Sequence, residues 1–312
     1  MLLERRVVDI SAERSYAKTA KAVVEHYGFE LPTSAIAKIT NATTQEAKEF
    51  NANVRGSSQE AETIVAQMDG SMVPIVEYSQ ASQEQKAAGL KKDRYCHWRE
   101  VRLCSASLPN SGLKLYGVVL GSPLEAGCMM SQTCEQLGMN SDTHIHGVGD
   151  GAVWIADQYE EQFGMNHDYY LDFYHACEYL AEASKSITAD NSSGQTSAHW
   201  LSMAKAMLKE GKSAELIDEL KSGINEIDAE CAVAKAHQYL SNRAENLNYP
   251  KALEAGLPIG SGEVESGHRS VLQARLKKPG AWWSLNNAEN MAHLKVLQEN
   301  NHWEEFWASK AA

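Results

Sequence analysis

The sequence lacks any long uninterrupted apolar run, and its cysteines lack the spacing of a metal or disulfide framework. No stretch approaches the roughly 18 to 20 uncharged apolar residues that a membrane-spanning helix needs, and the first residues have no apolar core of signal-peptide length. The six cysteines form no CxxC pair and have no histidine at zinc-finger spacing. We therefore expect a cytoplasmic protein without membrane contact, whose cysteines are reduced and mostly buried.

Several familiar catalytic motifs are also missing. There is no Walker A loop, no HExxH and no GxSxG, so ATP-driven, zinc-protease and serine-hydrolase chemistry lack a starting residue. Acidic residues also outnumber basic ones, which gives a net charge of −12. Proteins that bind phosphate backbones usually carry a basic excess. The basic residues are, however, concentrated in 90–102 and 256–283.

The order of the predicted elements indicates an α/β fold. Alternating apolar residues and turn signals predict three strands, a helix, a strand, a helix and a strand, followed by helices to the end. This is the RNase H-like order, with a mixed five-stranded sheet flanked by helices. The strands are expected at 62–78, 96–108, 113–121, 142–153 and 167–176, and the intervening helices at 122–138 and 153–163.

Four regions follow from this order. Residues 1–58 are predicted to be helical, with a helix-turn-helix outline that is a candidate for DNA contact, although such pairs are commonly structural. Their first clear helix places Ala17, Ala20, Val23 and Val24 on one face. Residues 59–178 form the RNase H-like core, 179–256 an all-helical insertion with a flexible interruption at 183–197, and 257–312 a further helix and tail.

Two aspartates stand out as candidate ligands of a hard cation such as Mg²⁺. Asp69 lies inside an apolar run, where a carboxylate is costly to bury unless it is paired or binds a metal. Its alternative role is to cap the turn that follows it. Asp150 has a glycine on each side, which lets a nucleic-acid backbone approach, and its alternative role is a helix N-cap. In the predicted sheet the two converge, although they are separated by 81 residues (150 − 69).

A third carboxylate lies on a helix predicted between residues 260 and 280. Steps of three and four residues place Glu265, His268, Arg269 and Leu272 on one face, so a carboxylate and a guanidinium point the same way. By spacing alone, an ordinary surface pair between Glu265 and Arg269 is the better interpretation. The spacing also leaves Glu263 as a competitor.

Four strings occur in a characteristic order: MDG, GDGAVWI, LDFYHACEYL and PIGSGEVESGHRSVLQARLKKPGAWW. Over roughly residues 5 to 305 the sequence resembles the ISKra-type transposases of bacterial insertion sequences, which are relatives of the Mutator group. The resemblance implies an Asp, Asp, Glu triad at Asp69, Asp150 and Glu265, and it favours Glu265 over Glu263. Members of that family are usually longer at the N-terminus, so we expect a truncated copy or one whose start is missing.

The resemblance also implies the chemistry and the partners. It predicts a DDE transposase that nicks and joins double-stranded DNA at transposon ends and target with two Mg²⁺ ions, for which Mn²⁺ can substitute, held by the three carboxylates. A homo-oligomer is expected because two DNA ends are paired, and the protein is expected on the bacterial nucleoid when bound to DNA. The Asp-x-x-His element of the family is matched by Asp172 and His175, which are expected to support the site.

Other residues are expected to contact DNA. Arg269 is placed to neutralise charge on a phosphate, and the basic end of the same helix, with Arg275, Lys277 and Lys278, is placed to follow the backbone. Trp282 is a candidate for stacking on an unpaired base, with core packing as an equal alternative for it and for the neighbouring Trp283. His144 and His146 are interpreted as structural, because no partner for a metal site is found.

Two alternative functions remain open at the level of the sequence. One is an RNase H-like nuclease that cuts without joining. The other is an inactive or truncated transposase fragment that only binds DNA or a partner protein, which the acidic balance and short N-terminus favour. Intact carboxylates argue against the second.

Overall fold

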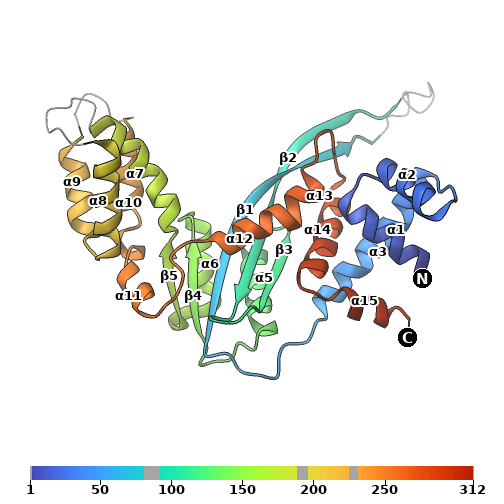
Figure 1. Cartoon of the computed structure of the whole chain (residues 1–312), viewed down its shortest axis with the longest axis horizontal. Helices are drawn as coiled ribbons and strands as arrows, with labels where there is room; N and C mark the ends of the chain where they lie inside the picture. The colour runs from blue at the N-terminus through green and yellow to red at the C-terminus, as the bar shows by residue number, and fades with distance from the viewer. Residues whose placement is uncertain (1, 81–90, 188–195, 225–230, 312) are drawn as a thin grey trace.

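A mixed five-stranded sheet lies at the centre of the computed structural model, which describes residues 2–80, 91–187, 196–224 and 231–311 (Figure 1). The strand order is β3-β2-β1-β4-β5. The first three strands are antiparallel, and β4 and β5 run parallel to β1, which is the predicted RNase H-like sheet. The strands span Thr63–Tyr78 (β1), Arg94–Ser107 (β2), Lys114–Val119 (β3), His144–Gly149 (β4) and His167–Leu171 (β5).

The two faces of the sheet are covered by different helices because strand residues alternate between them. Even-numbered β1 residues such as Ile64 and Met68 pack in a core with α5 (Pro123–Gln136) and α6 (Val153–Phe163). Odd-numbered β1 residues face the opposite side, which is covered by helices late in the chain. These are α12 (Gly262–Gly267), a π-helical segment (His268–Gln273), α13 (Ala274–Leu276) and α14 (Leu285–Glu299).

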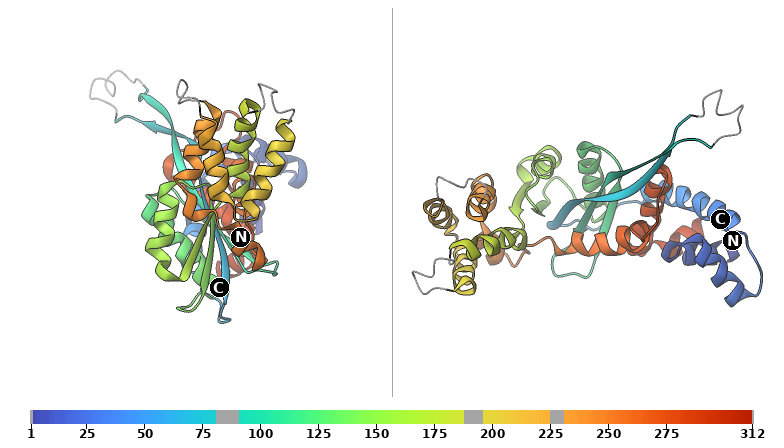
Figure 2. Two further views of the ribbon diagram at one scale, coloured as in Figure 1. Left: turned by 90° about the vertical axis from the view of Figure 1, so that its left-hand side faces the viewer. Right: turned by 90° about the horizontal axis from the view of Figure 1, so that it is seen from above.

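Two helical units flank the sheet at opposite ends of the molecule (Figures 1 and 2). The terminal unit combines both chain ends and consists of α1 (Leu2–Glu13), α2 (Tyr16–Tyr27), α3 (Thr33–Ala52), α14 and α15 (Trp303–Ser309). The insertion consists of α7 (Phe173–Ile187), α8 (Ser197–Lys209), α9 (Ser213–Ser222), α10 (Ala232–Ser241) and α11 (Tyr249–Glu254). Short 3₁₀ helices lie at Gly164–Asn166 and Ala244–Asn246.

Each unit shares a hydrophobic core with a different part of the sheet. The core of the terminal unit includes Val73 and Ile75 of β1 and Leu103 of β2. The core of the insertion includes Val148 of β4 and Tyr170 of β5. Strand alternation puts these residues on one face, so the sheet surface between the two cores, around the end of β4, is bounded by both units.

The fifth strand is shorter than predicted. It ends at Leu171 rather than at residue 176, and α7 begins at Phe173. The reason is Asp172, whose Oδ1 accepts a hydrogen bond of 2.8 Å from the backbone N–H of His175, as a helix N-cap does. The predicted insertion boundary at residue 179 therefore falls inside α7, and residues 188–195 of the expected flexible interruption lie outside the described chain.

The predicted N-terminal helices are present, with one difference in their apolar face. Gly28 ends α2 with φ of 73°, but Val24 is 44% exposed, and Thr19 and Ala22 pack inward with Val23 instead. The following helix, α3, runs for 20 residues and packs along α14. The helix-turn-helix outline is thus built into the terminal unit, and DNA contact by it stays a prediction.

The described part of the chain has no helix long and apolar enough to cross a membrane. All six cysteines are free. Cys104, Cys134 and Cys177 are buried, whereas Cys96 and Cys128 are exposed, so the expectation of mostly buried thiols holds for only half of them.

Candidate active site

Asp69 and Asp150 lie at equal distances in sequence beyond the last residue pair of β1 and β4. The parallel register of the two strands ends at the pair of Gln67 and Val148, and Asp69 and Asp150 each follow two residues later. Asp69 is still in β1, where side chains two residues apart share a face, so it points to the same side as Gln67, whereas Asp150 is the first residue after β4. The convergence of the two carboxylates stays a prediction of the strand order.

The carboxylate of Asp69 is held from two sides. Its Oδ1 accepts a hydrogen bond of 2.7 Å from the N–H of Gly70. Its Oδ2 lies 3.0 Å from Nε2 of His268, whose side chain is buried in the π-helical segment. Neither ring nitrogen of His268 has an aligned hydrogen-bond partner among the described residues, so this pair is a close electrostatic contact. One turn of π-helix is a common feature of functional sites.

Lys277 brings a positive charge to the same neighbourhood. Its Nζ donates to Oγ of Ser71, which lies two residues beyond Asp69 on the same strand face. Partial burial lowers the pKa of Lys277, and the negative charge of Asp69 opposes that shift. Lys277 is therefore close to the carboxylate as well as to solvent.

Asp150 lies directly after β4 and begins the loop that leads to α6. Its Oδ1 accepts a hydrogen bond of 2.8 Å from the N–H of Ala152, the residue that precedes α6. This bond forms a local turn and not the alternative N-cap role, because the N-cap of α6 is Ala152 and has no side-chain cap hydrogen bond. The turn uses one carboxylate oxygen of Asp150. The second oxygen, Oδ2, remains for other partners.

Gln67 makes three hydrogen bonds with the chain at the start of helix α12. Its Oε1 accepts hydrogen bonds from the N–H groups of Glu263 (3.1 Å) and Val264 (3.0 Å) at the start of the helix. Its Nε2 donates to the carbonyl of Gly260 at 3.2 Å. Because Gln67 lies two residues before Asp69, the start of α12 is tied to the strand that carries the candidate ligand.

The helix separates the two competing glutamates. At 3.6 residues per turn, Glu263 and Glu265 point about 160° apart on opposite flanks of α12. Glu263 is on the β3 side, near Lys114, whose pKa is raised mainly by a side-chain hydrogen bond to Tyr116 and to a smaller extent by the charge of Glu263. Glu265 is exposed on the other flank. The choice of Glu265 over Glu263 stays a prediction of the sequence resemblance.

The predicted single face of the helix is divided. His268 and Leu272 are buried against the sheet, whereas Glu265 and Arg269 are exposed. The physical reason is that the π turn departs from the 3.6-residue period assumed for the prediction. Across the described residues, no three His, Cys, Asp or Glu side chains form a group that could hold a metal ion.

Asp172 and His175 have separate roles in the structure. Asp172 is buried, and its Oδ2 accepts hydrogen bonds from the backbone N–H (2.6 Å) and the hydroxyl of Ser261, which joins α7 to the start of α12. His175 is partly exposed, with Nδ1 3.6 Å from Oε2 of Glu178. Asp172 therefore supports the helix that carries Glu265, and His175 lies on the surface of the insertion.

Arg275 is a correction to the predicted DNA-binding residues. It is 3% exposed, and its Nε donates to the carbonyl of Ser11 at 2.7 Å. Its guanidinium lies over the rings of Tyr16 (5.3 Å) and Trp283 (4.5 Å), and burial lowers its pKa. Arg275 therefore belongs to the core that joins α13 to the terminal unit, where its planar charged group is paired with carbonyl and ring partners.

Lys278 lies at the rim of a groove between α1, α2 and the turn that follows α13. Its Nζ donates to the carbonyl of Glu13. Three further exposed cations line this groove: Arg14, Lys18 and Lys21. The groove also contains Glu13 and Glu25, but the carboxylate of Glu13 is paired with Lys295. The groove therefore carries four cations and two carboxylates.

Trp283 is packed in the core, whereas Trp282 is partly exposed and stays a candidate for stacking on a base. Trp283 exchanges backbone hydrogen bonds with β1 at Pro74 and Val76 and is buried in the core. Trp282 is 38% exposed and lies 6.4 Å from the ring of Trp98, which is 55% exposed. The guanidinium of Arg94 is 5.8 Å from the Trp282 ring. We call Trp98, Trp282 and Arg94 the aromatic surface.

Sequence reasoning missed several residues that organise the site. Gln67 and His268 were not predicted to act there. Gln67 could have been identified, because it is a polar residue in an apolar strand two positions before Asp69. No local signal identifies Tyr239 and Arg243 of the insertion, which contact the Asp150 loop. His144 and His146 are structural as interpreted, bonded to Asp168 (3.2 Å) and to the carbonyl of Pro258 (2.7 Å).

Comparison with known proteins gives the following similarities. No family model matches the sequence. A UPF0236 protein in the vanSb 3′ region of Streptococcus gallolyticus is 26% identical over 169 residues, which are 50% of this chain and 34% of that protein. Among solved structures, the Drosophila P element transposase strand transfer complex aligns with 96% of this chain and 79% of its own, with 10% identity and a TM-score of 0.35. The match thus spans about a third of the curated relative's length.

Proposed function

We propose that this chain is a DDE transposase of the insertion-sequence type, which nicks double-stranded DNA and joins the resulting end to a target. The observation that carries the proposal is that Asp69 and Asp150 each follow, by two residues, the last residue pair of the adjacent parallel strands β1 and β4 in an RNase H-like sheet. Glu265, exposed on α12, adds a third carboxylate from another element. The resemblance to ISKra-type transposases in the four sequence strings supports the same assignment.

The three carboxylates have the donor chemistry that Mg²⁺ prefers, but in the described residues they are not gathered into a group that could hold the ion. All three candidate ligands are carboxylates, which are the oxygen donors that a hard cation prefers, and Asp69 and Asp150 each keep an oxygen that no backbone N–H occupies. Asp69, Asp150 and Glu265 would hold two ions, with Mn²⁺ as a substitute. When bound, the ions activate the attacking oxygen and stabilise the leaving oxygen of a phosphodiester.

The protein's own groups orient the ligands and the DNA. His268 and Gly70 keep the Asp69 carboxylate in place, and Gln67 together with Asp172 sets the start of α12. Arg269 is exposed one turn beyond Glu265, which suits contact with a phosphate oxygen. Catalysis of phosphoryl transfer depends mainly on such positioning and on charge stabilisation.

The DNA path is proposed from the charged and aromatic surfaces. Lys277, Lys278 and the groove cations of α1 and α2 suit the phosphate backbone next to the cleaved bond, because affinity for the backbone comes from clustered cations even in an acidic protein. The aromatic surface suits an unpaired base. Pairing of two DNA ends would require at least two copies of the chain, and DNA processing implies a cytoplasmic, nucleoid-associated protein.

The decisive experiment uses two substrates that contain the ends of the element. Intact duplex tests Mg²⁺-dependent nicking, and a pre-nicked duplex with a free 3′-hydroxyl tests joining. We expect both products with the wild-type chain, and neither with Asp69→Asn, since the amide lacks the charge of the carboxylate. The variant should keep the circular dichroism spectrum and melting temperature of the wild type.

Each alternative function gives a different result. Nicking without joined product would identify a nuclease and overturn the transposase proposal. Duplex binding without nicking in Mg²⁺ or Mn²⁺ would identify a binding fragment. Nicking that survives in Asp69→Asn would show that the carboxylates assigned here are not the reaction centre.

A further inference from the structure

The loop that carries Asp150 is held by the insertion through main-chain carbonyls. The hydroxyl of Tyr239 on α10 donates a hydrogen bond of 2.6 Å to the carbonyl of Asp150. The Nε of Arg243, just after α10, donates one of 2.8 Å to the carbonyl of Gly151. Two consecutive carbonyls of the loop are thus bound by side chains about 90 residues later in the chain.

The two donors are themselves held in place. The ring of Tyr239 stacks on that of Tyr179 from α7, with centroids 4.0 Å apart and planes 9° apart. The guanidinium of Arg243 lies over the Tyr239 ring at 4.2 Å, and its Nη1 donates to the carbonyl of Tyr239 at 3.1 Å. Stacked and hydrogen-bonded side chains lose little further freedom when they bind the loop.

The opposite side of the loop is held by the sheet. The N–H of Gly151 donates to the hydroxyl of Tyr169 on β5 at 3.2 Å. Gly151 has φ of 82°, and a Cβ there would lie 2.2 Å from Nε of Arg243 and 2.6 Å from a methyl group of Leu171. Glycine is therefore required both by the backbone conformation and by the close approach of Arg243.

We propose that the insertion acts as a positioning element for Asp150, with Tyr239 and Arg243 as the positioning residues. This inference rests on the proposed function, in which Asp150 must hold its carboxylate beside that of Asp69. Catalytic groups need to be held to within about 0.5 Å, whereas loops are the more mobile parts of a fold. The insertion supplies this precision from outside the sheet, without adding a side chain to the reaction centre.

The experiment compares two tyrosine-to-phenylalanine variants in the same unit. Tyr239→Phe removes the hydroxyl that binds the Asp150 carbonyl and keeps the stacked ring. Tyr249→Phe is the matched control, because the Tyr249 hydroxyl is buried in the insertion core and has no hydrogen-bond partner among the described residues. For both, we measure amide hydrogen exchange at residues 150–152, Mn²⁺ affinity by electron paramagnetic resonance, and single-turnover nicking.

We expect Tyr239→Phe alone to speed exchange at 150–152, to weaken Mn²⁺ binding, and to slow nicking about tenfold at unchanged KM for DNA, as the loss of one hydrogen bond implies. Its melting temperature should stay within about 2 °C of the wild type. Arg243→Lys, which keeps the charge but loses the Nε donor, should act in the same direction.

Two results would overturn the inference. One is a Tyr239→Phe protein whose exchange and Mn²⁺ affinity match those of Tyr249→Phe. The other is a rate loss that merely follows a lowered melting temperature. If the wild-type chain does not nick DNA at all, the proposed function fails, and the exchange and Mn²⁺ measurements still decide whether the insertion positions Asp150.

Discussion

The terminal unit and the insertion pack beside the same sheet, but they hold it by different contacts. The terminal unit joins its own helices through ion pairs such as Lys48 to Glu289 (2.7 Å), and it encloses the guanidinium of Arg275 between α1, α2 and Trp283. The insertion has an apolar core and reaches the site through the two side chains that bind the Asp150 loop. This difference suggests that the terminal unit supports the fold beneath α12, whereas the insertion sets the geometry of one ligand.

The two candidate aspartates are held from different units. Asp69 is held from the side of the terminal unit, because His268 lies on the helical segment that packs in that unit's core. Asp150 is held from the side of the insertion. Helix α12 runs between the units, anchored by Gln67 at one point and by Asp172 through Ser261 at another. Changes in the two units should therefore have separable effects on stability and on chemistry.

The largest expected effect distinguishes Glu265 from Glu263 as the third metal-binding carboxylate. Glu265→Gln should lower the single-turnover nicking rate at least about 1000-fold, since the amide removes a charge from the centre, equivalent to about 4 kcal/mol. Glu263→Gln, on the β3 side, should change it less than about threefold. A reversed order of the two variants would show that the other flank faces Asp150.

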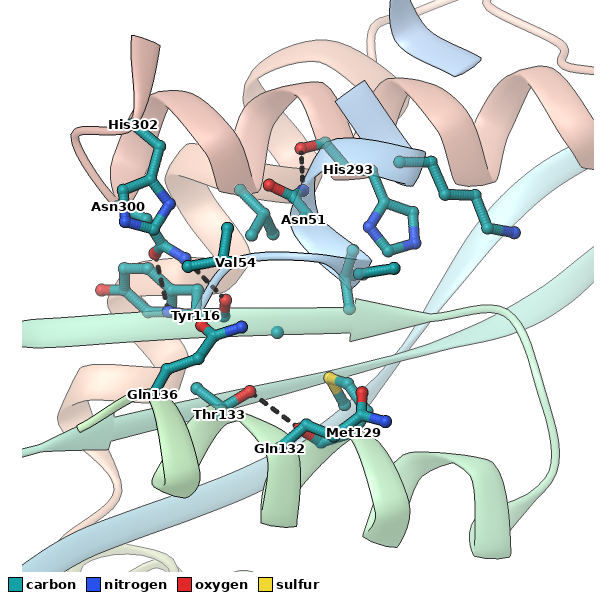
Figure 3. Close-up of a pocket in the computed structure, with 15 residues that line it drawn as sticks. Asn51, Val54, Tyr116, Met129, Gln132, Thr133, Gln136, His293, Asn300 and His302 are labelled. Atoms are coloured by element: carbon teal, nitrogen blue, oxygen red, sulfur yellow. Dashed lines mark hydrogen bonds between the residues drawn. The ribbon is translucent and has the colours of Figure 1, made fainter. Parts of the chain in front are cut away.

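The next prediction concerns pH and the terminal unit. His293 of α14 lines a small cavity with Lys48 and Asn51 of α3 and, further along, His302 (Figure 3). Burial, with a smaller contribution from the charge of Lys48, lowers the pKa of His293 from 6.5 to about 4. In the unfolded chain His293 therefore binds a proton near pH 6.5, whereas in the folded chain it does so only near pH 4.

This difference makes the folded state less stable in acid. The free energy of unfolding should fall as the pH drops from about 6.5 to 4, by up to about 3 kcal/mol, and the His293 contribution should be constant above that range. Urea unfolding at pH 7 and pH 4.5 checks this, with His293→Gln as the reference that lacks the titrating ring. An equal loss of stability in wild type and variant would contradict the lowered pKa of His293. Burial also lowers the pKa of His302, which therefore adds to the loss of stability in acid.

A smaller effect is expected from Arg275→Ala. Loss of its hydrogen bond to Ser11 and of its contacts with two rings should lower the free energy of unfolding by about 2 kcal/mol, measured in urea at pH 7. Its nicking rate below the melting transition should be unchanged. Arg269→Ala, an exposed neighbour, should show the opposite pattern of unchanged stability and slower nicking. If Arg275→Ala kept full stability but bound DNA more weakly, Arg275 would be a DNA-contacting residue after all.

The smallest expected effect lies outside both units, on the aromatic surface. Trp98→Ala and Trp282→Ala should each weaken binding to DNA with unpaired bases by about 1 kcal/mol, because each removes a stacking surface. Binding to fully paired duplex should change less. Met165→Ala, at a 98% exposed apolar residue remote from the aromatic surface, serves as the control. Equal losses on paired and unpaired DNA would indicate a backbone contact instead.

Much of the fold could be predicted because its signals are local. The alternation in β1, the capping box of Ser122 at α5 and the glycine that ends α2 each act within a few residues. Together they give the order of elements and hence the RNase H-like sheet. The end of β5 was misplaced because Asp172 caps a helix there, and its apolar neighbours Phe173 and Ala176 suit a strand equally well.

The site could be predicted only in part. The apolar surroundings of Asp69 and the glycines around Asp150 make both aspartates candidates, and the strand order predicts their convergence. Arg275 could not be distinguished from Lys277 and Lys278, because the three form one basic cluster in the sequence. Only packing shows that Arg275 is buried against Ser11, whereas Lys277 and Lys278 stay partly exposed.

The sequence by itself determined the types and order of the elements and which aspartates are candidate ligands, because backbone propensity and hydrophobic period operate over short distances. The tertiary structure decided which flank of α12 Glu265 occupies, where the helix widens at His268, and that Tyr239 holds the Asp150 loop. These features depend on contacts between residues about 90 to 200 positions apart. Such contacts form only when the sheet and both helical units are assembled.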